Sequence, residues 1–248
     1  MSSSLLAFST LLGLAAAVAK SCPASSPISC QTTGTIQNTC CTEVQGQVLQ
    51  VQFWDSSPAT GPANSWTIHG LWPDNCDGTY EATCDSSRAY TDIGCILEDK
   101  GHGDILTYME TYWKDYQGDD ESFCCYTNYS KEDELVDFLN TTITLFKSLP
   151  TYQWLANAGI TPSSSKTYTN AQITTALKNK FGATPILSCT SGKLNQIEYA
   201  YNVRGSVANG KFIAVEPTGT SGNCPKTGIK YVPKDLSTTP KANEGSCS

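Results

Sequence analysis

Polar and hydrophobic positions alternate in several segments of this 248-residue chain, and the alternation predicts β-strands. Residues 48–54 read Val-Leu-Gln-Val-Gln-Phe-Trp, and residues 194–203 place a large hydrophobic side chain at every second position in their middle. Residues 185–189 and 212–215 are also typical of strands. The predicted strands therefore lie towards both ends of the chain.

The middle of the chain predicts helices. Residues 91–100 and 104–116 form two helical segments that a Gly-His-Gly turn separates. A third begins at the capping pattern of Ser130 and continues to Pro150, and a fourth runs from Thr169 to Gly182. Strands at both ends with helices between them favour an α+β fold, in which helices pack on an antiparallel β-sheet.

The N-terminus predicts export. Residues 5–18 are apolar and uncharged, and Ala17-Val18-Ala19 matches a cleavage site, so residues 1–19 are expected to be a signal peptide. The alternative is a buried N-terminal helix. Residues 20–248 have the length of one large domain. We expect a monomer without membrane contact that is extracellular or reaches a vacuole or lysosome through the secretory pathway.

Twelve cysteines agree with an oxidising compartment, because an even number permits full pairing. A zinc site is disfavoured, since the chain has two histidines and no C-x-x-C pair. The doublets Cys40-Cys41 and Cys124-Cys125 would be strained as internal bridges, so each is expected to join different parts of the chain. Asn128 and Asn140 begin N-x-S/T sequons and are candidate glycosylation sites.

The net charge of −7 argues against binding nucleic acid over a broad basic face. It leaves room for a pocket that holds one or two phosphates. The strongest chemical signal is the segment 65–74, where His69 lies between two tryptophans and is followed by Asp74. Histidine suits proton transfer near neutral pH, and tryptophan offers a flat face for a base. The alternative is a half-buried core segment with a structural histidine.

The stretch Ile68-His69-Gly70-Leu71-Trp72-Pro73-Asp74 resembles the first active-site signature of the ribonuclease T2 family, H-G-L-W-P. Gln52-Phe53-Trp54, Tyr112-Trp113-Lys114, the Cys-Tyr-Thr-Asn-Tyr stretch at 125–129 and residues 185–194 are also similar to the family. The resemblance covers nearly the whole mature chain and is strongest to the fungal branch.

The resemblance implies an endoribonuclease that cleaves single-stranded RNA with low base specificity, without a metal or other cofactor. His69 would be one of two histidines that transfer protons. Trp72, Asp74 and Tyr80 match a base-binding site, and Phe123 matches a residue that holds the neighbouring base. The ribose 2′-hydroxyl attacks phosphorus and leaves a 2′,3′-cyclic phosphate, so DNA is not a substrate.

The resemblance also implies a framework of disulfides, in which Cys95 and Cys247 have no assigned place and either pair or stay free. The cysteines expected to pair are Cys22, Cys30, Cys40, Cys41, Cys76, Cys84, Cys124, Cys125, Cys189 and Cys224.

One family segment, E-H-E-x-x-K-H-G-T-C, is missing from this sequence. It carries the second proton-transferring histidine and should follow Phe123, where the chain instead continues directly into Cys124. The other histidine, His102, lies in a glycine-rich turn where the family has no catalytic residue. Either the deletion is real, or the sequence comes from a misread exon boundary.

Three hypotheses follow: a ribonuclease, a T2-like protein that binds RNA or nucleotides without cutting, and a secreted structural or effector glycoprotein. His69 and the set of Trp72, Asp74 and Tyr80 favour the first two. The missing segment favours the binding protein for this chain, whereas the family as a whole favours the ribonuclease.

Overall fold

The structure is a computed structural model that describes residues 22–31, 36, 41–80, 90, 92–114, 131–219 and 221–238. The expected signal peptide and the candidate residues Phe123 and Asn128 lie outside these ranges. In chain order the elements are β1 (Gln47–Phe53), β2 (Thr67–Asp74), α1 (Ile93–Asp99), α2 (Gly103–Tyr112), α3 (Lys131–Ser148), α4 (Thr151–Asn157), β3 (Thr167–Tyr168), α5 (Asn170–Phe181), β4 (Ile186–Thr190), β5 (Lys193–Arg204), β6 (Lys211–Ala214), β7 (Ile229–Lys230) and the short 3₁₀ helix η2 (Leu236–Thr238).

One sheet joins the strands in the order β2-β1-β5-β7-β3, with β4 and β6 also paired to β5. Long antiparallel ladders join β1 to β2 and to β5, and β2 is the first strand of this order. The sheet is mixed rather than wholly antiparallel, because Lys193 of β5 pairs with Lys230 of β7 in parallel. The α+β prediction is confirmed, with this one difference in strand direction.

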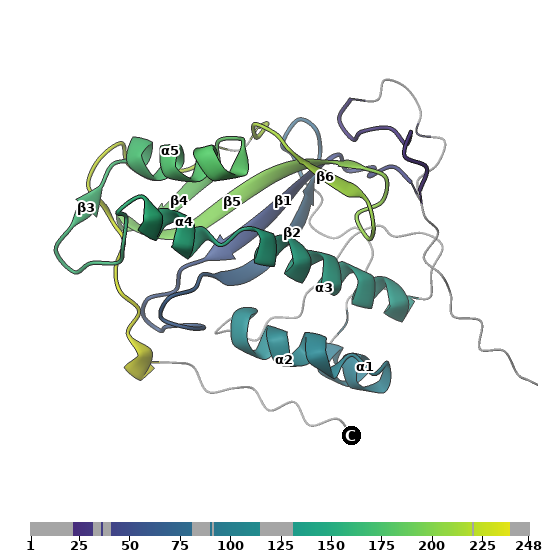
Figure 1. Ribbon diagram of the computed structural model, residues 1–248, viewed down its shortest axis with the longest axis horizontal. Coiled ribbons are helices and arrows are strands. Elements are labelled where there is room, and N and C mark those ends of the chain that lie inside the picture. Colours follow the sequence, from purple (N-terminus) through teal and green to yellow (C-terminus); the bar gives the residue numbers. More distant parts are fainter. Residues whose placement is uncertain are drawn as a thin grey trace, which may run out of the picture.

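The helices α3, α4 and α5 lie over the same face of the sheet (Figure 1), which we call the helical face. Large side chains such as Leu139 of α3, Leu177 of α5 and Tyr199 of β5 fill the space between the layers and are fully buried. Helix α1 is tied to α3 by Lys100, whose ammonium lies 3.1 Å from Glu132 and 2.9 Å from Asp133. On the other face, Leu49, Val51 and Ala200 form a small buried hydrophobic cluster.

Local sequence explains both ends of α5. The hydroxyl of Thr169 accepts from the backbone N–H of Gln172, whose side chain accepts in return from the N–H of Thr169, and Gly182 closes α5 at φ 98°. This capping box was predicted. Helix α4 was not: it begins immediately after Pro150, a residue suited to a helix start. Strand β2 was not predicted either, because Gly70 and Pro73 interrupt its pattern.

Disulfides join distant parts of the chain. Among the described residues, Cys22 pairs with Cys41, Cys30 with Cys76 and Cys189 with Cys224, and Cys95 is also disulfide-bonded. Cys41 thus pairs with a cysteine outside its doublet, as predicted, and Cys95 does not stay free. The remaining candidates lie outside the described residues, namely Cys40, Cys84, Cys124, Cys125 and Cys247.

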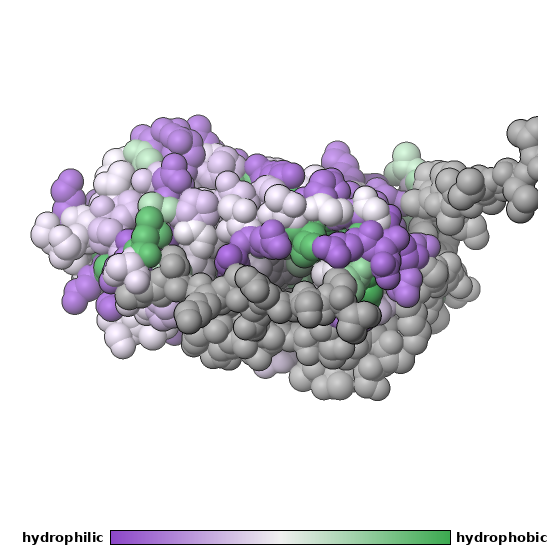
Figure 2. Space-filling view, turned by 90° about the horizontal axis from the view of Figure 1, so that it is seen from below, coloured by the Kyte–Doolittle hydropathy of each residue, from purple (hydrophilic) through white to green (hydrophobic). Residues whose placement is uncertain are grey.

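No helix within the described ranges is long and apolar enough to cross a membrane. Seen from below, the described surface is mostly hydrophilic, with hydrophobic residues in small separate patches (Figure 2). Asn140 lies exposed on α3, so its sequon is accessible, and its glycosylation stays a prediction.

Candidate active site

A β-bulge places His69 at the site. Val51 of β1 pairs with Gly70, whereas the next residue, Gln52, pairs with Ile68, so His69 is the extra residue on β2. Bulges bend a strand and redirect a side chain, and they are frequent next to active sites. Here the imidazole stacks on the ring of Phe53, with centroids 3.9 Å apart and an interplanar angle of 18°. The half-buried histidine is therefore held flat against an aromatic ring.

The glycine after His69 makes room for Trp72. A Cβ added to Gly70 would lie 3.0 Å from Nε1 of Trp72, so the indole crosses directly over this glycine. The indole centroid lies 5.2 Å from that of His69. Trp72 remains 42% exposed, which leaves ring surface for a stacking partner. The spacing of the histidine, glycine and tryptophan thus has a steric explanation.

Asp74 ends β2 as a buried carboxyl. It pairs across the ladder with Gln47, while Trp72 pairs with Leu49, so these side chains share the face opposite the helices, which we call the site face. Burial and, to a smaller extent, the charge of Glu198 raise the pKa of Asp74 to about 6. At mildly acidic pH this carboxyl can therefore donate a hydrogen bond as well as accept one.

Tyr80 follows a tight turn at the end of β2. The backbone N–H of Asn75 donates to the carbonyl of Thr79 at 2.7 Å, and Oδ1 of Asp77 accepts from both the N–H and the hydroxyl of Thr79. Tyr80 itself is 71% exposed. The structure thus brings His69, Trp72 and Asp74 together on one strand, and it places Tyr80 beyond the turn.

Sequence reasoning missed two residues of the site face. Phe53 was noted only as part of a family resemblance, although it supports His69. Glu198 of β5 lies opposite Val51, is 7% exposed and accepts from Nε2 of Gln196 at 2.7 Å. Burial raises its pKa. The alternation along β5 was the available signal, because Gln196 and Glu198 are polar positions between the hydrophobic residues of a long buried strand.

His102 belongs to a different part of the molecule. It precedes α2, and its charge acts on Asp137 of α3, whose pKa is raised by burial and by Asp133 and lowered in part by His102. Helix α3 covers the helical face, whereas His69 lies with Phe53 on the site face. The two histidines of the chain are therefore not brought together.

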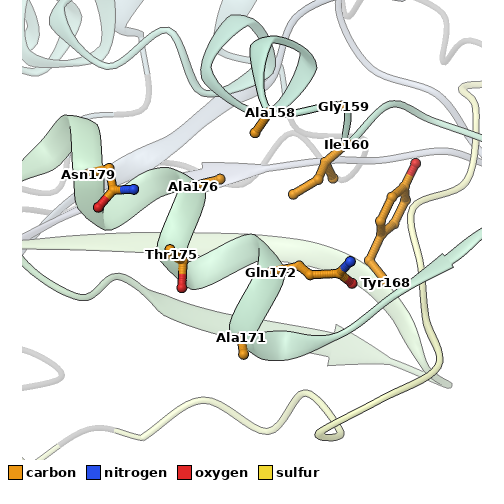
Figure 3. A pocket seen from close by; sticks show the side chains of 9 residues that line it. All are labelled: Ala158, Gly159, Ile160, Tyr168, Ala171, Gln172, Thr175, Ala176 and Asn179. Atoms are coloured by element: carbon orange, nitrogen blue, oxygen red, sulfur yellow. The ribbon is translucent and has the colours of Figure 1, made fainter.

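A cavity of about 480 Å³ lies between the end of α4 and α5, away from His69 (Figure 3). The hydroxyl of Tyr168 already donates to the carbonyl of Thr161, and Gln172 is engaged in the capping box of α5. The residues that line the cavity are Ala158, Gly159, Ile160, Tyr168, Ala171, Gln172, Thr175, Ala176 and Asn179. None of them is a histidine, a carboxylate, a lysine or a cysteine.

Comparison with known proteins identifies the family to which this fold and site belong. The sequence model of the Ribonuclease T2 family matches residues 28–224, so the chain belongs to the ribonuclease T2 family and is by family an endoribonuclease. It is 50% identical over 232 residues to ribonuclease Trv of Hypocrea rufa, covering 87% of this chain and 99% of the relative. It is 45% identical over 233 residues to ribonuclease T2 of Aspergillus oryzae, covering 86% and 84%. The crystal structure of Actibind, a T2 ribonuclease, superposes with a TM-score of 0.79 at 42% identity, covering 86% of this chain and 98% of Actibind.

Proposed function

We propose that the site face binds single-stranded RNA and cleaves it through His69 by transesterification, at a lower rate than in the fungal relatives. The observation that carries the proposal is the arrangement of His69, Trp72 and Asp74 on β2. It combines a group able to transfer protons, an exposed ring and a buried carboxyl on one face of a rigid sheet.

Each residue has a role that its position supports. A base stacks on the exposed face of Trp72, and Asp74 hydrogen-bonds the edge of that base. A base on the protein takes the proton of the 2′-hydroxyl, the 2′-oxygen bonds to phosphorus, and the bond from phosphorus to the 5′-oxygen breaks. An acid returns a proton to the 5′-oxygen. His69 serves one of these two proton transfers, and DNA is excluded because it lacks the nucleophile.

The lower rate follows from the histidine count. The chain has two histidines, and His102 acts on α3 rather than at the site. The alignment to ribonuclease Trv spans 232 positions, which is more than the 87% of this 248-residue chain that it includes. Some residues of the relative therefore have no counterpart in this chain, which supports a missing segment. The junction of Phe123 with Cys124, where the segment should lie, is outside the described residues. Loss of one acid–base partner typically lowers a rate by about 10²–10⁴.

The test is cleavage of single-stranded RNA at mildly acidic pH by the purified chain, beside His69→Ala and beside ribonuclease Trv. We expect slow cleavage with 2′,3′-cyclic phosphate ends, which His69→Ala abolishes. A rate equal to that of ribonuclease Trv would overturn the proposed loss. Cleavage that persists in His69→Ala would overturn the role of His69. Sequencing the transcript across 123–124 separates a real deletion from a misread exon boundary.

The second candidate is an RNA- or nucleotide-binding protein without cleavage. The separation of the two histidines favours it, because a surface with one proton-transfer group and no second one can bind RNA without cleaving it. Tight nucleotide binding without any detectable cleavage by the folded chain would select it over the ribonuclease.

We also infer export of a monomer that is either extracellular or vacuolar. The disulfides Cys22–Cys41, Cys30–Cys76 and Cys189–Cys224 support an oxidising compartment. Expression with the native leader in a fungal host, followed by size-exclusion chromatography of the culture medium, tests both points. Retention of the uncleaved chain inside the cell would contradict the inference.

A further inference from the structure

Residues 215–219 cross the site face from its far edge to the end of β2. The backbone N–H of Val215 donates to the carbonyl of Ala200 on β5 at 3.0 Å. The Val215 side chain packs on the buried cluster of Leu49, Val51 and Ala200. We call residues 215–219 the crossing segment.

A side chain next to Asp74 holds the crossing segment in place. Oε1 of Gln47 accepts from the N–H of Thr218 at 2.9 Å, and Nε2 of Gln47 donates to the carbonyl of Thr218 at 3.3 Å. Gln47 is 2% exposed and pairs directly with Asp74 in the β1–β2 ladder. The two hydrogen bonds of Gln47 therefore hold the crossing segment beside Asp74, the carboxyl that we assign to base recognition.

The end of the crossing segment then meets the turn that carries Tyr80. A Cβ on Gly219 would lie 2.6 Å from Cα of Gly78, and a Cβ on Gly78 would lie 2.5 Å from Cα of Gly219. Real Cβ atoms do not come this close, so two glycines are required where the backbones touch. Each side is fixed by a disulfide nearby in sequence, Cys30–Cys76 for the turn and Cys189–Cys224 for the chain after the segment.

We propose that the crossing segment positions the base-binding residues, with Gln47 and Gly219 as positioning residues that set the discrimination between bases. The proposal rests on the proposed function, because it deepens the role of the same site. Asp74 lies directly before the turn and Tyr80 directly after it. A displacement of the turn therefore changes the distance between the carboxyl and the ring that would contact a base.

The test uses Gly219→Ala and the matched control Gly228→Ala. Both glycines have a positive φ, 77° and 79°, but a Cβ on Gly228 meets nothing within 4 Å. The two variants share the backbone strain and differ in the contact with the turn. Calorimetry with the four nucleoside 5′-monophosphates gives the dissociation constants, and thermal unfolding gives the stability of each variant.

We expect Gly219→Ala to weaken binding by about tenfold or more and to change the ratio of affinities among the four bases, since small displacements at a site have large effects. Gly228→Ala should keep the wild-type affinities and ratio. Equal affinities and ratios in the two variants would overturn the inference. Absence of nucleotide binding by the wild-type chain would overturn the proposed function instead, so the two failures are distinguishable.

Gln47→Met covers the case in which Gly219→Ala does not fold. Methionine keeps about the volume of glutamine and removes both hydrogen bonds to the exposed residue Thr218. We expect the same change in base ratio, without loss of the cooperative unfolding transition. An unchanged ratio in folded Gln47→Met would count against the crossing segment as a determinant of specificity.

Discussion

The imidazole of His69 lies almost parallel to the phenyl ring of Phe53, at a centroid distance of 3.9 Å. The contact exists because the bulge adds His69 to β2 opposite the end of β1, where the side chain of Phe53 points to the same face. A histidine that transfers protons needs a fixed orientation, and a stacked ring provides it without occupying a ring nitrogen.

Replacement of Phe53 by leucine should release His69. The variant removes the stacked pair, which is worth about 0.5–1.5 kcal/mol beyond burial. We expect the ring-proton resonances of His69 to move towards their solvent-exposed positions in NMR spectra. The chain has two histidines, so His102 is an internal reference in the same spectrum. Unchanged His69 resonances in Phe53→Leu would show that the stack does not hold the imidazole.

Replacement of Gly70 by alanine should displace Trp72. The new Cβ would sit 3.0 Å from Nε1 of the indole, so the ring must shift by a few tenths of an ångström. We expect weaker nucleotide binding, by at most about 1–3 kcal/mol, which is the usual contribution of one stacked base. Calorimetry measures the effect. The control is Gly103→Ala at the start of α2, where a Cβ meets nothing within 4 Å. Equal affinities in the two variants would contradict the steric role of Gly70.

The sequence predicted the parts of the fold that local patterns specify. The capping box of Thr169 and Gln172 and the alternation of β5 both correspond to elements of the structure. Strand β2 was not predicted, because it forms by pairing with β1 and because Gly70 and Pro73 weaken the local strand pattern. The parallel pairing of β7 with β5 was not predicted either, because it joins Lys193 with a residue 37 positions later and no local pattern indicates it.

The residues of the candidate site also divide into those that a local pattern predicts and those that only the fold brings together. His69, Trp72 and Asp74 were predicted because they lie in one continuous motif. Phe53 and Glu198 come from other strands, so only the ladder register brings them to the same face. Gln47 and Gly219 are still less visible, because a buried amide and a glycine have no distinctive pattern until the crossing segment is seen to meet the turn.

The stability of the protein should depend on pH through Asp74. Its folded pKa of about 6 lies above the ordinary value of 3.8, so the folded state binds this proton more tightly than the unfolded state does. The resulting stabilisation is complete below about pH 4 and is lost as the pH rises through 6. A shift of this size corresponds to at most about 3 kcal/mol.

Urea unfolding of the wild type and Asp74→Asn at pH 4 and pH 7 measures this contribution. Asparagine does not titrate, so the stability of the wild type relative to the variant should fall as the pH rises. Glu198, whose pKa is also raised, is present in both proteins, and because its charge acts on Asp74 the comparison reports the titration of Asp74 together with its coupling to Glu198. Parallel pH dependence of the two proteins would show that Asp74 titrates normally.

Lys234 follows β7 and is a largely buried lysine, 9% exposed. Its ammonium donates to the carbonyl of Thr60 at 2.6 Å and to that of Ser65 at 2.7 Å, and it lies 4.6 Å from the centroid of the Trp54 ring. Burial lowers its pKa to about 8, and the nearby carboxylate of Asp55 opposes the shift. The lysine thus fastens the loop that leads into β2 to the C-terminal part of the fold.

Lys234→Met should lower the free energy of unfolding by about 1–3 kcal/mol, because two carbonyls lose their donor in a buried position. Methionine retains most of the apolar contact with Trp54, so the loss reports mainly on the hydrogen bonds. The control is Lys230→Met, which removes an exposed lysine of β7 and should change stability by less than about 0.5 kcal/mol. If both variants unfold at the wild-type urea concentration, Lys234 does not stabilise the loop.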